Sequence, residues 1–183
     1  MPAPALLLVA ATSLTPLPPV VQAGITLPYG TMPGVQVGYR HALTPRAARA
    51  SVAAVTLGAD LSSVVDPGDF VRLGVAATAG MRWLRPSGFG LEVEGSLELS
   101  PQLQTLGQTV ALGSGELTHE REWRLGLLPA ATGRLSWRGH ERLGVYAGLT
   151  LGPRIDLGRR VIAEYSANVG LRVNLGAMKE GGE

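Results

Sequence analysis

The sequence predicts an all-β chain that folds into a closed, antiparallel, up-and-down barrel. Three observations lead to this prediction. Apolar and polar residues alternate with a period of two over most of the chain, Pro, Gly or Asp residues interrupt this alternation at short intervals, and no segment has the period of an amphipathic helix. Because short turns join most of the consecutive strands, we expect neighbouring strands to pair antiparallel.

The composition excludes several other classes of protein. Of the 183 residues, 45% are apolar and 16% are charged, compared with about 25% charged residues in an average soluble protein. No segment reaches the roughly 20 apolar residues of a membrane-spanning helix. The chain has no cysteine, which excludes a disulfide scaffold and a thiolate metal site. The net charge of +2 is too small to call for nucleic acid or another acidic partner.

Residues 1–23 are interpreted as an export signal, which leaves 24–183 as the mature barrel domain. No charged residue precedes Arg40, a short apolar run covers 5–11, and the Val-Gln-Ala segment at 21–23 has the small-x-small pattern that signal peptidase accepts. The basic residues that usually begin such a signal are missing, which leaves the true start codon open. The alternative interpretation is a disordered leader rich in proline and alanine.

Seven segments alternate clearly enough to be predicted as strands: 34–43, 51–62, 70–84, 89–99, 120–137, 142–152 and 161–175. Turn residues separate most of them, at 44–46, 66–69, 85–88, 138–141 and 153–158. The longer segment 100–118 is either a mobile loop or a short polar strand with two turns. Soluble sheets usually have strands of about five or six residues, so the lengths here suit strands that cross a bilayer at a tilt.

The two faces of these strands indicate which side lies inside the barrel. The polar face carries equal numbers of cations and anions, as an enclosed charge network requires. Glycines gather on the same face, where they leave room for long side chains. The predicted lumen network consists of Arg40, Asp60, Arg72, Arg82, Glu92, Glu94, Glu98, Glu120, Glu122, Arg124, Arg134, Arg142, Glu164 and Arg172.

Tryptophans on the apolar face lie near the ends of the strands. Trp123 and Trp137 are 14 residues apart on one strand, which corresponds to roughly 35 Å along the membrane normal for a tilted strand. This separation is close to that of two interfacial aromatic girdles, and Trp83 would join Trp137 in one of them. The sequence therefore favours a transmembrane barrel with its apolar face toward lipid.

A soluble, lipocalin-like barrel has the same alternation with its faces reversed and stays open as the alternative. It would be periplasmic and would hold an apolar ligand. A GC-rich genome would also account for the glycines and for the 15 arginines against one lysine.

The segments Gly-Phe-Gly-Leu-Glu-Val-Glu-Gly at 88–95 and Gly-Val-Tyr-Ala-Gly at 144–148, together with the leader and the alternating strands, resemble small outer-membrane β-barrel proteins of Gram-negative bacteria. The resemblance implies eight strands, short periplasmic turns, longer external loops, and contact with outer-membrane lipid and the barrel-assembly machinery. The eighth strand would come from 24–32 or from 104–112, and the first choice keeps both Trp-flanked turns on the periplasmic side. Such proteins usually end on an aromatic residue, whereas this sequence ends with Met178-Lys-Glu-Gly-Gly-Glu183.

Few residues offer catalytic chemistry. The histidines His41, His119 and His140 lack the spacing of metal ligands, and we expect no metal and no cofactor. The sharpest enzymatic hypothesis is a lipid hydrolase on the outer wall that uses His119 with Ser114 and Glu116, because a Ser–His–acid set can act as a nucleophilic triad. We expect instead a barrel that is not an enzyme, whose filled lumen leaves it a structural role or a role through its loops. The sequence leaves its ligand, its oligomeric state and its conductance open.

Overall fold

The computed structural model describes residues 14–16, 18–30, 32–43, 45–47, 52–66, 70–85, 87–110, 117–140, 142–157 and 160–176. The strands in this part of the chain are β1 (Leu14–Pro16), β2 (Val20–Pro28), β3 (Gly34–Ala42), β4 (Pro45–Ala47), β5 (Val52–Asp66), β6 (Phe70–Leu84), β7 (Phe89–Val110), β8 (Leu117–Trp137), β9 (Leu143–Asp156) and β10 (Arg160–Asn174). None of the described residues forms a helix long and apolar enough to cross a membrane.

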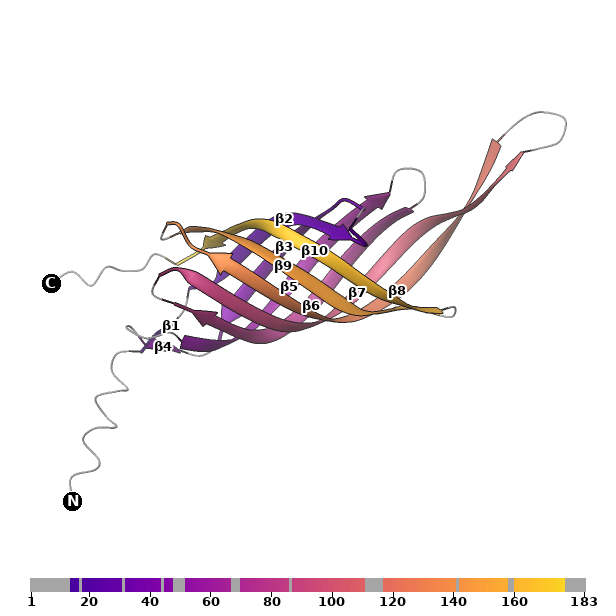
Figure 1. The fold of residues 1–183 in the computed structure, drawn as a ribbon. Helices are drawn as coiled ribbons and strands as arrows, with labels where there is room; N and C mark the ends of the chain where they lie inside the picture. Colours follow the sequence, from indigo (N-terminus) through magenta and orange to yellow (C-terminus); the bar gives the residue numbers. More distant parts are fainter. Residues whose placement is uncertain are drawn as a thin grey trace, which may run out of the picture.

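Eight of the described strands close into one antiparallel barrel in the order β10-β2-β3-β5-β6-β7-β8-β9 (Figure 1). Each barrel strand pairs with the next barrel strand along the sequence, β3 with β5 included, and β2 pairs with β10 to close the ring. The short strands β1 and β4 form a separate two-stranded sheet. The predicted fold class, a closed up-and-down barrel, is confirmed.

The eighth strand is β2, which covers Val20–Pro28 and lies close to the first of the two predicted positions, 24–32. The second position, 104–112, is wrong because residues up to Val110 continue β7. The other seven strands overlap the predicted segments, although β5, β7, β8 and β9 extend beyond them by three or more residues.

The segment 100–118 is neither a loop nor a separate strand over its described part. Residues 100–110 extend β7 and pair with the first half of β8, with one register shift between Thr105 and Gly107. β6 pairs with β7 only as far as Gln104, and β9 pairs with β8 only from Gly126. Residues 105–110 and 117–121, called the β7–β8 arm below, therefore project beyond both neighbouring strands (Figure 1).

Strand β9 continues through Asp156, so the predicted turn at 153–158 begins too early. Pro153 pairs with Ala163 of β10. On the other side of β9, the register pairs with β8 stop between Leu151 and Ile155. Proline has no N–H to donate to a ladder, and here it interrupts pairing on one side without ending the strand.

The connections at the two ends of the barrel differ less in length than the family resemblance implies. At the end where β2 begins and β10 ends, called the terminal end below, the connections cover 43–51, 85–88 and 138–142. At the opposite end, called the arm end, they cover 29–33, 67–69, 111–116 and 157–159. The expectation of longer loops on one side is therefore wrong for three of the four arm-end connections. The long projection there comes from the β7–β8 arm.

Strand β2 includes Val20–Ala23, the last residues of the predicted export signal. In the structure these four residues pair with β10 on one side and with β3 on the other. Cleavage after Ala23 would thus remove four of the nine residues of the strand that closes the barrel. The export signal stays a prediction.

The side chains have the inside-out distribution that the alternation predicts. Large apolar residues lie on the outer wall, for example Leu149 at 62% exposed and Val169 at 55%. Charged residues that point inward are almost completely buried, and Arg40 and Glu92 are each 2% exposed. The barrel therefore presents an apolar wall around an ionic interior.

Candidate functional site

A cluster of four charged side chains fills the middle of the lumen. Arg40 donates from Nε and Nη2 to the Glu94 carboxylate at 2.5 and 2.9 Å, and from Nη1 and Nη2 to the Asp60 carboxylate at 2.8 and 2.7 Å. Arg134 also bonds to Glu94 and lies 3.9 Å from Asp60. This central cluster thus has two guanidinium groups and two carboxylates, each in contact with both partners of opposite charge.

Glycines on neighbouring strands create the space that the central cluster occupies. A Cβ atom on Gly38 would overlap the Asp60 carboxylate, and one on Gly148 would lie 2.6 Å from Cγ of Arg134. On the outer wall, a Cβ atom on Gly133 would meet no atom within 4 Å. The lumen glycines therefore make room for long side chains, as the sequence pattern predicts.

A second group of charges lies toward the arm end. Arg72 forms a two-pronged bond to Glu164, with distances of 2.8 and 2.7 Å. Arg154 donates from Nε to Asp156 at 2.9 Å and lies 3.8 Å from Glu164. We call Arg72, Arg154, Asp156 and Glu164 the outer cluster. Glu98 lies beside it and accepts a bond of 3.4 Å from the Ser62 hydroxyl.

Arg154 and Asp156 are lumen residues that the sequence analysis missed. Both are buried, at 2% and 5% exposed. The sequence predicts a turn at these positions because Pro153 favours the end of a strand. The period of two continues through Arg154 and Asp156, and this was the signal that could have identified them.

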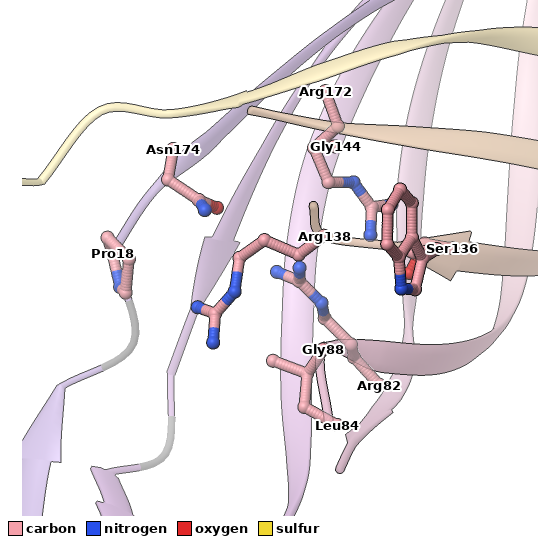
Figure 2. Close-up of a pocket in the computed structure, with 10 residues that line it drawn as sticks. Pro18, Arg82, Leu84, Gly88, Ser136, Arg138, Gly144, Arg172 and Asn174 are labelled. Carbon is pink, nitrogen blue, oxygen red and sulfur yellow. The ribbon is translucent and has the colours of Figure 1, made fainter. Parts of the chain in front are cut away.

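The terminal end of the lumen holds a third group, the mouth cluster of Arg82, Glu92 and Arg172. Glu92 lies 3.0 Å from Nε of Arg82 and 2.5 Å from Nη2 of Arg172. Two guanidinium groups therefore share one carboxylate. These two arginines and Arg138, from the turn after β8, line a pocket that opens at this end (Figure 2).

The remaining residues of the predicted network lie at the rims or outside the described side chains. Arg124 contacts Glu122 at 3.3 Å and donates to Gln104 at 2.8 Å near the arm end. Arg142 is exposed in the turn between β8 and β9, so its assignment to the lumen is wrong. It falls there because β9 begins one residue later, at Leu143. The structure does not describe the side chain of Glu120.

The three predicted girdle residues are exposed on the outer wall, with Trp83 at 37%, Trp123 at 71% and Trp137 at 56%. Trp83 and Trp137 lie at the terminal end, next to the turns at 85–88 and 138–142. Trp123 pairs with Leu103 at the base of the β7–β8 arm, near the opposite end. The tryptophans therefore lie near both ends of the apolar wall.

The side chains of the hydrolase hypothesis lie outside the part of the chain that the structure describes. Ser114 and Glu116 lie outside the described residues, and of His119 only the backbone is described, in β8. Among the described residues, no three His, Asp or Glu side chains are placed to hold a metal ion.

The lumen leaves little free space between the central and outer clusters. The cavity there is lined by charged and hydroxyl side chains, including Asp60, Arg72 and Thr132, and has room for only a few water molecules. Buried arginine–carboxylate pairs lie on both sides of this cavity. Such pairs tie together strands that are distant in the sequence.

Comparisons with known proteins agree with the geometry at the level of the fold. The crystal structure of Neisserial surface protein A matches with a TM-score of 0.53 and 15% identity, over 85% of this chain and 96% of that one. The N-terminal β-barrel domain of OprF from Pseudomonas aeruginosa matches with a TM-score of 0.49 and 16% identity, over 87% of this chain and 99% of that one. No family model and no curated protein matches the sequence. The chain thus has the closed eight-stranded barrel fold of small outer-membrane proteins such as Neisserial surface protein A, as the sequence resemblance predicts.

Proposed function

We propose that this chain is an integral outer-membrane barrel whose lumen is sealed by paired charges. The observation that carries the proposal is the inside-out distribution of side chains, with leucines and valines exposed around an ionic interior. In water, such a wall would far exceed the few hundred Å² of contiguous apolar surface that soluble monomers usually expose. In a bilayer the same wall is the favourable one, since charged side chains on a lipid face cost about 2–4 kcal/mol each at the midplane.

The sealed lumen favours a structural role or a role through the exposed ends over transport. From the arm end to the terminal end, the outer, central and mouth clusters follow one another along the lumen, and each consists of buried ion pairs. A barrel of eight strands is just wide enough for side chains to fill. The β7–β8 arm is the largest projection and the natural candidate for contacts with partners. We further propose that lipid and the barrel-assembly machinery are the contacts of the barrel itself.

Gel mobility tests the closed membrane barrel. Extracted in a mild detergent and left unheated, the chain is expected to migrate as a compact species, and heating should shift it to the position of an unfolded 19.1 kDa chain. Cell fractionation is the companion measurement. Recovery in the detergent-extracted envelope supports the proposal, whereas recovery in the osmotic-shock fluid contradicts it.

Planar-bilayer recording tests the sealed lumen separately from the location. We expect the pure protein to give no large, stable conductance. A steady conductance of the size of an open water-filled pore would refute the sealed lumen and leave the membrane location intact.

The lipocalin-like alternative loses support from the direction of the faces. A carrier of apolar ligands needs an apolar interior, whereas here Arg40, Arg72 and Glu94 point inward and are buried. The hydrolase hypothesis depends on Ser114, Glu116 and His119 and stays a prediction. It would be refuted if the substitution His119→Ala left the lipid composition of the membrane unchanged.

A further inference from the structure

We propose that the pocket at the terminal end of the barrel binds a small oxyanion, namely a phosphate or carboxylate group. The pocket lies beside the mouth cluster and is lined by residues from several strands and turns: Pro18, Arg82, Leu84, Gly88, Ser136, Trp137, Arg138, Gly144, Arg172 and Asn174. Three of these are arginines, and none is acidic. Figure 2 shows the side chains of Arg82, Arg138 and Arg172 gathered around this space.

The first argument is local charge. Arg82 and Arg172 share the single carboxylate of Glu92, and no ion pair joins Arg138 to any other described residue. The central cluster, by contrast, has one carboxylate for each guanidinium group. Counted over the described side chains, the lumen as a whole is balanced, but its terminal end carries excess positive charge. Uncompensated charge in a buried position is costly, and a bound anion would remove that cost.

The second argument is the set of unused hydrogen-bond donors. Arg172 is 4% exposed, yet its Nε and Nη1 atoms have no hydrogen-bond partner among the described residues. Nε of Arg82 is also without an aligned acceptor, although it forms an ion pair with Glu92. A buried donor left unpaired costs about 1–3 kcal/mol. The guanidinium groups of Arg82 and Arg172 match the oxygen geometry of phosphate and carboxylate groups, so an anion in the pocket would compensate both once these side chains turn toward it.

The neighbouring groups fit the same ligand. The ring of Tyr146 lies 6.0 Å from Cζ of Arg172, so one side of this guanidinium faces an aromatic ring. Ser136 adds a hydroxyl group to the pocket lining, and Asn174 adds an amide. Since the pocket opens at the end of the barrel, an anion could reach it from the aqueous side or as the headgroup of a lipid. The proposal depends on the barrel fold alone and stands apart from the proposed sealing role.

The test is titration of the full-length protein in an uncharged maltoside detergent at low ionic strength. Inorganic phosphate is one probe, followed by calorimetry and by broadening of its phosphorus NMR signal. Micelles doped with phosphatidylglycerol are the second probe, with phosphatidylcholine, which has no net charge, as their reference. Saturable binding of either anionic probe is expected. Comparison of the two probes distinguishes binding of free phosphate from binding of a lipid headgroup.

Matched variants locate the site. Arg138→Gln is expected to weaken binding about fivefold or more, because one of three guanidinium groups is lost. Arg142→Gln removes the same charge from the same turn but lies outside the pocket, so it should leave the affinity unchanged. Both positions are in a turn, where the barrel should fold with either residue. Absence of saturable binding with both probes, or equal weakening by the two variants, would overturn the proposal.

Discussion

The central and mouth clusters use the same chemistry and differ in stoichiometry. In the central cluster, Arg40 and Arg134 face two carboxylates, so losing any one member leaves an unmatched charge. In the mouth cluster, Arg82 and Arg172 share Glu92, so one guanidinium is already in excess. Charge balance across a whole lumen therefore says little about balance at one level of it. The balanced cluster is suited to stability, whereas the unbalanced one is suited to binding.

The largest expected effect is the loss of a carboxylate from the balanced cluster. We expect Glu94→Gln to lower the free energy of unfolding by about 3–5 kcal/mol, because Arg40 and Arg134 would keep only Asp60 between them. Urea unfolding of the barrel refolded in micelles would measure the change. Glu122→Gln is the control, since this residue is partly exposed at the rim and should cost about 0–1 kcal/mol. Equal decreases in the free energy of unfolding of the two variants would contradict a larger contribution of the central cluster to stability.

A smaller effect is expected from removing an arginine at the mouth. Arg172→Gln should cost about 1.5–3 kcal/mol, the range for a hydrogen bond to a charged group, because Glu92 keeps its ion pair with Arg82. Arg40→Gln is the matched change in the central cluster and should cost more, since two carboxylates would lose their main partner. The same unfolding measurement compares them. If Arg172→Gln proved the more damaging substitution, the mouth would not carry an excess of cation.

The smallest effect concerns the space around the clusters. We expect Gly38→Ala to cost about 1–3 kcal/mol, because the added Cβ would overlap the Asp60 carboxylate. Gly133→Ala, on the outer wall, meets no neighbouring atom and should be neutral or stabilising by up to about 1 kcal/mol. The two substitutions are chemically identical, so the difference between their unfolding midpoints reports the packing of the lumen directly. A destabilising effect of Gly133→Ala as large as that of Gly38→Ala would refute this assignment.

The faces of the strands could be predicted from the sequence, but the pairings between charges could not. Alternation is a local property, so it identified Arg72 and Glu164 as inward-facing without knowledge of any partner. Their bond joins β6 to β10 across the lumen, and it depends on how the strands are staggered around the barrel. The offset between strands cannot be predicted from a local sequence pattern. Hence the members of the network were largely predictable, and its division into three clusters was not.

Two errors at strand ends have a common physical origin. Pro153 and the polar segment after Ser100 each predict, from the sequence alone, that a strand stops. Each lies where a strand loses a partner on one side and keeps one on the other: β9 keeps β10 beside Pro153, and β7 keeps β8 beyond Gln104. Proline and polar residues in a sequence indicate where the pairing of a strand with a neighbouring strand is locally unfavourable. They do not indicate whether a neighbouring strand can still support the backbone.

The seam between β2 and β10 has a consequence for how the molecule is made. Val20 lies opposite Asn174, so the ring joins residues from nearly opposite ends of the described chain. A contact over such a sequence separation is slow to form, and it cannot exist until the last strand has been synthesised. The apolar strand segments of a nascent chain must therefore be kept from associating with one another until synthesis is complete. The greatest risk of misassembly comes before β2 and β10 pair and close the barrel.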